Sequence, residues 1–183
     1  MKEFSSASAR AGFTLMELII VIGVTMVLSA VVLGYSRSSE NQIALYKDQA
    51  AIVGFLNEAK SLAIQKYNQP GTTGYIACAF GVHFETANTF VIFQDLEPGD
   101  VCPRSRTYAY NAGADPTELI KSATLDSGIS FSDLSGGSSL DIEFIAPEVT
   151  VTSTVVNPSV TLRTVSGISA RIEVGSGGQI VTQ

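Results

Sequence analysis

The feature that most constrains this chain is a long apolar run near its N-terminus, from Phe13 to about Tyr35. A helix needs about 20 predominantly apolar residues to cross a bilayer, and this run is long enough. An ordinary signal peptide has a shorter apolar core of about 7–15 residues, followed by a small-residue cleavage site that this run lacks. The sequence therefore predicts a helix that remains in the mature protein as a membrane anchor.

One carboxylate, Glu17, lies inside this apolar run. On insertion scales, an acidic residue in the middle of a spanning helix costs about 2.5–3.5 kcal/mol, so it is a functional-site hypothesis by default. The alternative is that the Glu17 side chain reaches the membrane surface and has no specific role.

The run is preceded by a short polar leader that contains Lys2 and Arg10 and ends at Gly12. Together with the sequence Phe13-Thr14-Leu15-Met16-Glu17, this leader resembles the N-terminus of type IV pilins and type II secretion pseudopilins. In that family a prepilin peptidase cuts after the glycine and the new N-terminal phenylalanine is methylated. The resemblance implies that residues 1–12 are a leader peptide, that cleavage separates Gly12 from Phe13, and that Phe13 carries the methyl group.

The resemblance also gives Glu17 a role, because in the family a glutamate is the fifth residue of the mature chain. It implies that the carboxylate pairs with the α-amine of Phe13 on a neighbouring subunit in a filament. A free α-amine has an ordinary pKa near 8 and is mostly cationic at neutral pH. Pairing within one chain is also physically possible, since residues four apart lie on one face of a helix. The implied partners are prepilin peptidase, other pilin or pseudopilin subunits and the inner membrane.

Charge is scarce in this chain and mostly negative. The net charge is −6 and charged residues make up 15%, against roughly 25% in ordinary soluble domains. Basic residues in the leader agree with a cytoplasmic N-terminus and a periplasmic domain after Tyr35. Nucleic acid is not expected as a partner, because phosphate binding needs clustered basic residues. The candidate basic residues are Arg104 and Arg106, which lie close together, and Arg163 and Arg171 near the C-terminus. Four arginines on a domain with excess carboxylates are a poor match for phosphate.

Helical spacing of apolar residues continues beyond the membrane run. The stripe consists of Ile52, Val53, Leu56, Ala59, Ala63 and Tyr67, and it predicts an amphipathic helix. The sequence Asn68-Gln69-Pro70-Gly71 then predicts the end of the helix. We expect one helix with a transmembrane part over residues 13–35 and an extracytoplasmic continuation over residues 36–67.

Residues 68–183 are predicted to form a β-rich globular domain. The first two strands, Tyr75–Phe84 and Thr89–Phe93, are expected to form a hairpin with Ile76, Cys78 and Phe80 on one face and a bulge at Gly81. Further strands are predicted at Ile120–Leu125, Ile129–Phe131, Leu140–Ile145, Val149–Val156, Val160–Val165, Ser169–Val174 and Gln179–Thr182. The expected fold class is α+β, with a long, partly transmembrane N-terminal helix packed on an antiparallel β-sheet domain.

The order of these elements is similar to that of minor pseudopilins of the GspH/FimT type. The likeness rests on Tyr75–Phe84 with Phe90–Asp95, on Ile142–Pro147, and on Ala170–Val174 before the last glycines. It implies a non-enzymatic structural subunit of a type II secretion pseudopilus or a type IV pilus. A DNA-uptake (competence) pilin or a major pilin shares the same N-terminus. A membrane-anchored enzyme or solute-binding domain is the alternative from another class.

The two cysteines, Cys78 and Cys102, both lie on the expected outer side of the membrane. An even number of cysteines in an oxidising compartment predicts a disulfide. Closing a loop of about 24 residues would contribute about 3 kcal/mol in the chain-entropy model. Two free, buried thiols are the alternative.

The sequence predicts no catalytic residue, metal site or cofactor. His83 is the single histidine and has no partner at metal-ligand spacing, so a structural role is expected. No nucleophile elbow and no phosphate-binding loop is present. Asp95, Glu97 and Asp100 form an acidic segment that could hold Ca²⁺, but a solvated loop is the simpler interpretation.

Overall fold

The computed structural model describes residues 13–66, 74–99, 102, 109–110, 118–145 and 150–183. Within this part of the chain it contains one helix and nine strands. The leader, Tyr67 and the expected helix stop at residues 68–71 lie outside the described residues. The chain forms two compact units, Met1–Ser39 and Glu40–Gln183.

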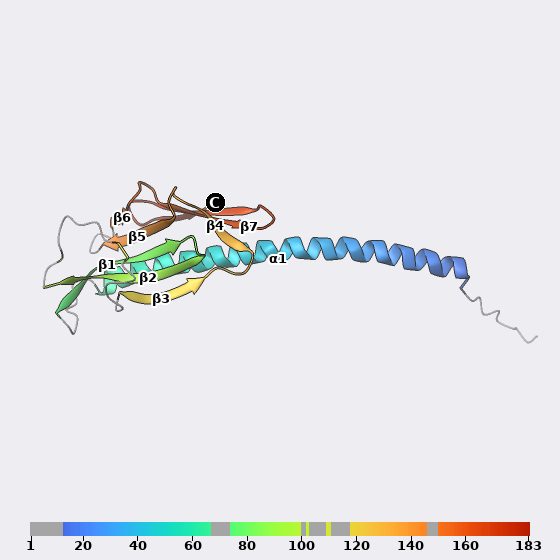
Figure 1. Ribbon diagram of the computed structural model, residues 1–183, viewed down its shortest axis with the longest axis horizontal. Coiled ribbons are helices and arrows are strands. Elements are labelled where there is room, and N and C mark those ends of the chain that lie inside the picture. The colour runs from blue at the N-terminus through green and yellow to red at the C-terminus, as the bar shows by residue number, and fades with distance from the viewer. Residues whose placement is uncertain (1–12, 67–73, 100–101, 103–108, 111–117, 146–149) are drawn as a thin grey trace, which may run out of the picture. The chain divides into compact units, whose positions relative to one another are not determined.

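The single helix, α1, runs without a break from Leu15 to Lys66 (Figure 1). Residues 13–34 are all exposed within the first unit. Two polar side chains there bond back to the helix, Thr25 Oγ1 to the Val21 carbonyl at 2.9 Å and Ser29 Oγ to the Thr25 carbonyl at 2.7 Å. By length and composition alone, α1 contains a segment that could cross a membrane.

In the second unit, one face of α1 is buried against β-strands. Ile52, Leu56 and Ala59 are 0% exposed and Ala63 is 1% exposed. The predicted apolar stripe is therefore confirmed at these positions. It forms because residues three and four apart share one face of a helix, and that face lies on the domain core.

The strands form two antiparallel sheets (Figure 1). The five-stranded sheet has the order β3-β2-β1-β5-β6, and the four-stranded sheet has the order β4-β7-β8-β9. The α+β prediction is thus confirmed, with two sheets in the β domain. The strands are β1 (Tyr75–Glu85), β2 (Thr89–Pro98), β3 (Leu119–Thr124), β4 (Ile129–Leu134), β5 (Ser139–Ile145), β6 (Thr150–Ser153), β7 (Ser159–Thr164), β8 (Ser169–Val174) and β9 (Ile180–Thr182).

One hydrophobic core joins the buried face of α1 to the inner faces of both sheets. Its centre is aromatic. The Phe90 ring lies edge-on to Phe55 of α1 at 4.7 Å between centroids, and Phe84 lies edge-on to Phe131 of β4 at 5.8 Å. Such aromatic pairs contribute about 0.5–1.5 kcal/mol beyond the area they bury. The helix and both sheets are therefore packed through one shared set of rings.

Polar contacts also tie α1 to the strands of its own unit. Lys121 of β3 bonds Glu58 at 2.7 Å, and its Nζ lies 4.7 Å from the centroid of the Phe55 ring. Lys47 bonds Asp126 at 2.8 Å. Asp48 is buried and accepts the Asp126 backbone N–H at 2.9 Å. The exposed ion pairs are each worth about 0–1 kcal/mol, so the packed face supplies most of the attachment.

The bulge in the first hairpin lies at Cys78, and its predicted position at Gly81 is wrong. Pairing between β1 and β2 is irregular between Ala77 and Ala79, which makes Cys78 the extra residue. Gly81 keeps a regular pairing with Phe93. A Cβ on Gly81 would lie 2.7 Å from the Phe93 Cζ atom, so the glycine serves close approach of a ring.

The bulge also changes which side chains share a face. The prediction that Ile76, Cys78 and Phe80 lie together is wrong for Phe80. An extra residue reverses the alternation of a strand. Phe80 therefore joins the main core, while Ile76, Cys78 and Ala79 pack as a separate cluster on the other face.

The acidic segment predicted as a loop is largely strand. β2 continues to Pro98 because its whole length pairs with β1. Asp95 and Glu97 are consequently strand residues, and Glu97 is only 7% exposed. The solvated-loop interpretation is therefore wrong for Glu97, whereas Asp100 lies outside the described residues.

Strand β6 ends at Ser153, three residues before the predicted end at Val156. Val156 is 92% exposed, and Asn157 has a φ of 53°. The apolar pattern continues here without a strand because the chain must pass from the five-stranded sheet to β7 of the four-stranded sheet.

Candidate functional site

The first turn of α1 is closed by a reciprocal pair of contacts between Thr14 and Glu17. The Glu17 backbone N–H donates to Thr14 Oγ1 at 3.2 Å, and the Thr14 backbone N–H donates to Glu17 Oε2 at 3.1 Å. The Thr14 hydroxyl donates to the same carboxylate oxygen at 3.1 Å. This is the capping box expected from a threonine followed three residues later by a glutamate.

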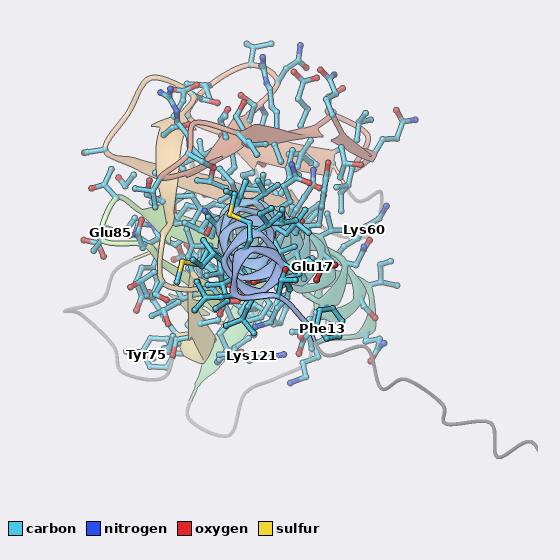
Figure 2. The ribbon with its side chains drawn as sticks, turned by 90° about the vertical axis from the view of Figure 1, so that its right-hand side faces the viewer. Phe13, Glu17, Lys60, Tyr75, Glu85 and Lys121 are labelled. Atoms are coloured by element: carbon cyan, nitrogen blue, oxygen red, sulfur yellow. A yellow bond between two sulfur atoms is a disulfide. The ribbon has the colours of Figure 1, made fainter. Side chains whose placement is uncertain are left out.

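The box fixes where the helix begins and where the Glu17 carboxylate lies. A negative group at a helix N-terminus is favoured by the helix dipole and by backbone N–H groups without helical partners. Phe13 precedes the box outside the helix and is 82% exposed. Figure 2 shows Phe13 and Glu17 together at this end of α1. Gly12 lies outside the described residues.

This arrangement holds the Glu17 carboxylate about one helical turn from Phe13. In the uncut chain, Thr14 satisfies the Glu17 carboxylate locally. If the chain is cut before Phe13, a cationic amine appears next to that carboxylate. The same carboxylate can then pair with an amine of its own chain or of a neighbouring chain.

Comparison with protein-family models, curated proteins and solved structures finds no match to this chain. The candidate site consequently rests on the chain's own residues and geometry.

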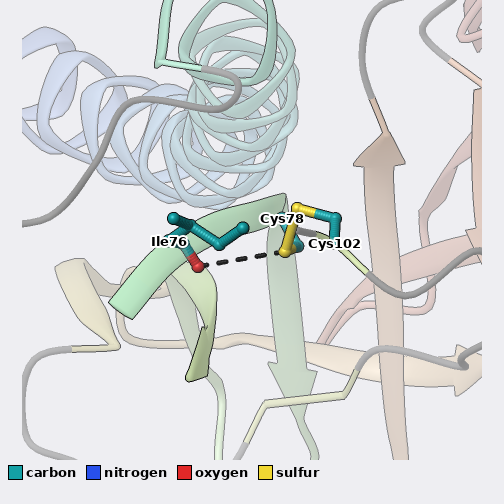
Figure 3. The surroundings of a disulfide bond; sticks show 3 residues. All are labelled: Ile76, Cys78 and Cys102. Carbon is teal, nitrogen blue, oxygen red and sulfur yellow. Dashed lines mark hydrogen bonds between the residues drawn. A yellow bond between two sulfur atoms is a disulfide. The ribbon is translucent and has the colours of Figure 1, made fainter. Parts of the chain in front are cut away.

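The two cysteines form a disulfide (Figure 3). The Cα atoms of Cys78 and Cys102 are 5.4 Å apart, within the usual range for a bridge. Cys78 Sγ also lies 3.9 Å from the Ile76 carbonyl oxygen. Cys102 packs with Ile145 against the small cluster that includes Cys78. The bridge therefore attaches the connection after β2 to the outer face of the five-stranded sheet.

His83 has a structural environment on that same outer face. Its Nδ1 lies 2.6 Å from Asp141 Oδ1, and both side chains are mostly buried. The Tyr110 ring lies 5.0 Å from the His83 ring and 5.4 Å from the Phe93 ring, measured between centroids. His83 thus links β1 to β5 and to the connection between β2 and β3.

Glu143 of β5 is the most unusual polar residue on this face. It is 1% exposed, and its Oε2 atom has no hydrogen-bond partner. Burial, with smaller contributions from Asp141 and Asp95, raises the pKa of Glu143 to about 8. Among the described residues, no group of three or more His, Cys, Asp or Glu side chains is placed to hold a metal ion.

Sequence reasoning overlooked Thr14 and Glu143. The Thr14-x-x-Glu17 spacing is a recognisable capping signal, but the family resemblance assigns roles to Gly12, Phe13 and Glu17 and none to Thr14. Glu143 alternates with the apolar residues Ile142 and Phe144, a pattern typical of a solvent-facing position. Only the tertiary structure shows that its face of the sheet is covered.

Proposed function

We propose that this protein is a non-enzymatic structural subunit, a minor pseudopilin or pilin of the GspH/FimT type. It serves a type II secretion pseudopilus or a type IV pilus. In this proposal prepilin peptidase removes residues 1–12 and Phe13 becomes the methylated N-terminus. Residues 13–35 then anchor the subunit in the inner membrane, with the β domain in the periplasm.

The observation that carries this proposal is the start of α1. A leader ending in glycine is followed directly by a capped helix whose first turn holds a carboxylate. The helix then continues unbroken for 52 residues. A helix of this kind suits a subunit that is built into a fibre through the N-terminal part of the helix and displays a domain packed on the C-terminal part.

The chemistry of assembly follows from the charges at this turn. An unpaired carboxylate in hydrocarbon is costly, and pairing with a cationic amine offsets the cost. The amine exists only after cleavage. Cleavage is therefore required before the amine–carboxylate pair can set the register in which a subunit enters the fibre. Methylation of the amine keeps its positive charge and adds apolar surface.

The experiment that tests processing is co-expression of the full chain with a prepilin peptidase, followed by intact-mass measurement. The expected product lacks residues 1–12 and carries a methylated Phe13. Gly12→Val should block cleavage, since a bulky side chain before the cut hinders entry of the backbone into the protease. An unprocessed wild-type chain would contradict the proposal and favour a membrane-anchored protein of another class.

Deletion of the gene for this protein distinguishes the machines that the subunit could serve. A secretion pseudopilin predicts loss of protein export, a pilus subunit predicts loss of surface fibres, and a competence pilin predicts loss of DNA uptake. A major pilin would also be the most abundant component of purified fibres.

A further inference from the structure

The turn between β7 and β8 lies at the end of the second unit where α1 enters it (Figure 1). Near that end, Lys47 of α1 bonds Asp126 in the connection between β3 and β4. Two residues after Asp126, the Gly128 carbonyl accepts the Val165 N–H at 3.2 Å. A Cβ on Gly128 would lie 3.4 Å from Val165 Cγ2. These contacts place Val165 close to the start of the unit.

The β7–β8 turn is closed by its own hydrogen bonds and carries an exposed apolar side chain. The buried Thr164 donates its N–H to the Ile168 carbonyl at 2.8 Å, and its Oγ1 accepts the Ile168 N–H at 3.0 Å. Gly167 has a φ of 90° and donates to the Thr164 carbonyl at 2.9 Å. These bonds hold the turn in shape, while Val165 at its tip is 83% exposed.

A cation lies over the same turn. The exposed Arg163 side chain places its Nη2 atom 3.7 Å from the position of a Cβ on Gly167. Among the described residues, no carboxylate forms an ion pair with Arg163. The chain as a whole carries a net charge of −6, so a free cation at this tip departs from the rest. An exposed apolar side chain beside a cation is a combination suited to the lipid headgroup layer.

The length of the connection places this end of the unit close to the bilayer. The proposed membrane run ends at about Tyr35, and the second unit begins at Glu40. Five residues span about 18 Å when fully extended and about 7.5 Å as a helix. Ile43, 68% exposed, and Tyr46, 61% exposed, add apolar surface at the same end. Tyrosine is enriched at membrane–water interfaces.

We propose that the β7–β8 turn docks on the membrane surface, with Val165 in the interface and Arg163 paired with anionic lipid headgroups. The inference rests on the membrane anchor of the proposed function and adds a second contact to it. An anionic surface attracts the basic turn and repels the acidic remainder of the domain. The contact thereby sets which side of the β domain faces the bilayer before the subunit enters a fibre.

The experiment uses tryptophan as the probe, because the chain contains none. Val165→Trp and Val156→Trp replace exposed valines beyond opposite ends of β7. Each full-length variant is inserted into nanodiscs of phosphatidylethanolamine and phosphatidylglycerol that carry a nitroxide on the headgroup. The fluorescence of Val165→Trp should be quenched and shifted to the blue, whereas that of Val156→Trp should change in neither way.

The contribution of Arg163 is measured in the Val165→Trp background. Arg163→Gln should lower the ratio of docked to undocked domains about fivefold, since it removes one basic residue from an anionic surface. Nanodiscs of phosphatidylcholine alone should cause a similar loss. Quenching that changes with neither the substitution nor the lipid charge would overturn the headgroup pairing of Arg163.

Leu28→Trp in the membrane run, with bromine on the lipid acyl chains, reports the anchor separately. Quenching of Leu28→Trp without quenching of Val165→Trp overturns the docking proposal and leaves the anchor intact. Absence of quenching in Leu28→Trp overturns the anchor itself. Equal quenching of Val165→Trp and Val156→Trp would also overturn docking through this turn. Ser166→Trp, at the same exposed tip, decides the outcome if Val165→Trp fails to fold.

Discussion

The space that a side chain at Gly81 would need, in the middle of β1, is already filled by neighbouring atoms. A Cβ there would lie 2.7 Å from Phe93 Cζ and 2.8 Å from the Ile142 carbonyl oxygen. Real Cβ atoms do not approach other heavy atoms so closely, and the backbone oxygen cannot move away without disturbing the β1–β5 ladder. The absence of a side chain at this position lets the Phe93 ring cover the strand.

Gly81→Ala should therefore destabilise the domain by about 1–3 kcal/mol, the usual cost of overpacking. Gly177→Ala is the matched control, because a Cβ at Gly177 would meet nothing within 4 Å. That control should change stability by less than about 0.5 kcal/mol. Urea unfolding of both full-length variants, followed by circular dichroism, measures the difference. Equal stability of the two variants would refute the steric role of Gly81.

Glu17→Val tests the residue on which assembly is proposed to depend. The variant should be cleaved after Gly12 nearly as well as wild type, because the junction itself is unchanged. It should enter fibres poorly, since the amine of a neighbouring subunit loses its carboxylate. Cleavage is measured by intact mass, and incorporation by the amount of subunit in sheared fibres.

Glu40→Gln is the control for that substitution, because Glu40 lies on the same helix and is exposed. It should be processed and incorporated as wild type. If Glu17→Val were incorporated normally, the charge-pairing role would be excluded.

Thr14→Val removes a hydroxyl from the capping box and keeps the shape of the side chain. The N–H of Glu17 and its carboxylate each lose one bond to Thr14 Oγ1. Loss of an N-cap costs about 1 kcal/mol, so amides of the first turn of α1 should exchange roughly fivefold faster. Thr14→Ser keeps the hydroxyl and should exchange as wild type. Hydrogen exchange of the full chain in micelles measures both, and unchanged exchange in Thr14→Val would contradict the box.

At the scale of elements, α1 is attached to the β domain by its buried face more than by its ion pairs. Leu56 is 0% exposed in the core, whereas the adjacent Asn57 is exposed. Leu56→Ala should lower the free energy of unfolding by about 3 kcal/mol, since it removes buried methyl groups and leaves a cavity. Asn57→Ala should change it by less than about 0.5 kcal/mol.

Thermal unfolding of the two variants under one set of conditions distinguishes these expectations. Both substitutions introduce alanine on the same helix, and alanine has the highest helix propensity. A loss of stability in either variant therefore does not come from helix propensity. A similar loss of stability in both variants would mean that the buried face of α1 does not contribute more to stability than its exposed face.

Element positions were predictable where a pattern had one interpretation. The stripe of α1 and the starts of β1, β2 and β8 follow directly from helical or alternating periodicity. The position of the bulge was not predictable, because an extra residue leaves no mark in a sequence whose apolar residues occupy both faces of β1. Its position at Cys78 is set by pairing with β2 and by the covering of the outer face.

At the scale of the whole molecule, the disulfide joins the connection after β2 to the outer face of the five-stranded sheet. Replacing Cys78 and Cys102 together by alanine should lower the free energy of unfolding by about 3 kcal/mol, from the lost constraint on the unfolded chain. Urea unfolding with and without reductant checks this expectation. Reductant should destabilise wild type by a similar amount and leave the double variant unchanged; a wild type insensitive to complete reduction would contradict the prediction.

The sequence by itself determined the long apolar helix, the β-rich remainder and the position of one carboxylate in the first turn. These features depend on periodicity and local composition, which involve only residues close together in the sequence. Tertiary structure alone decided that there are two sheets, that Phe80 and Cys78 point to opposite faces, and that Glu143 is buried. Each of these depends on pairing between strands far apart in sequence, and pairing determines which side of a strand meets water.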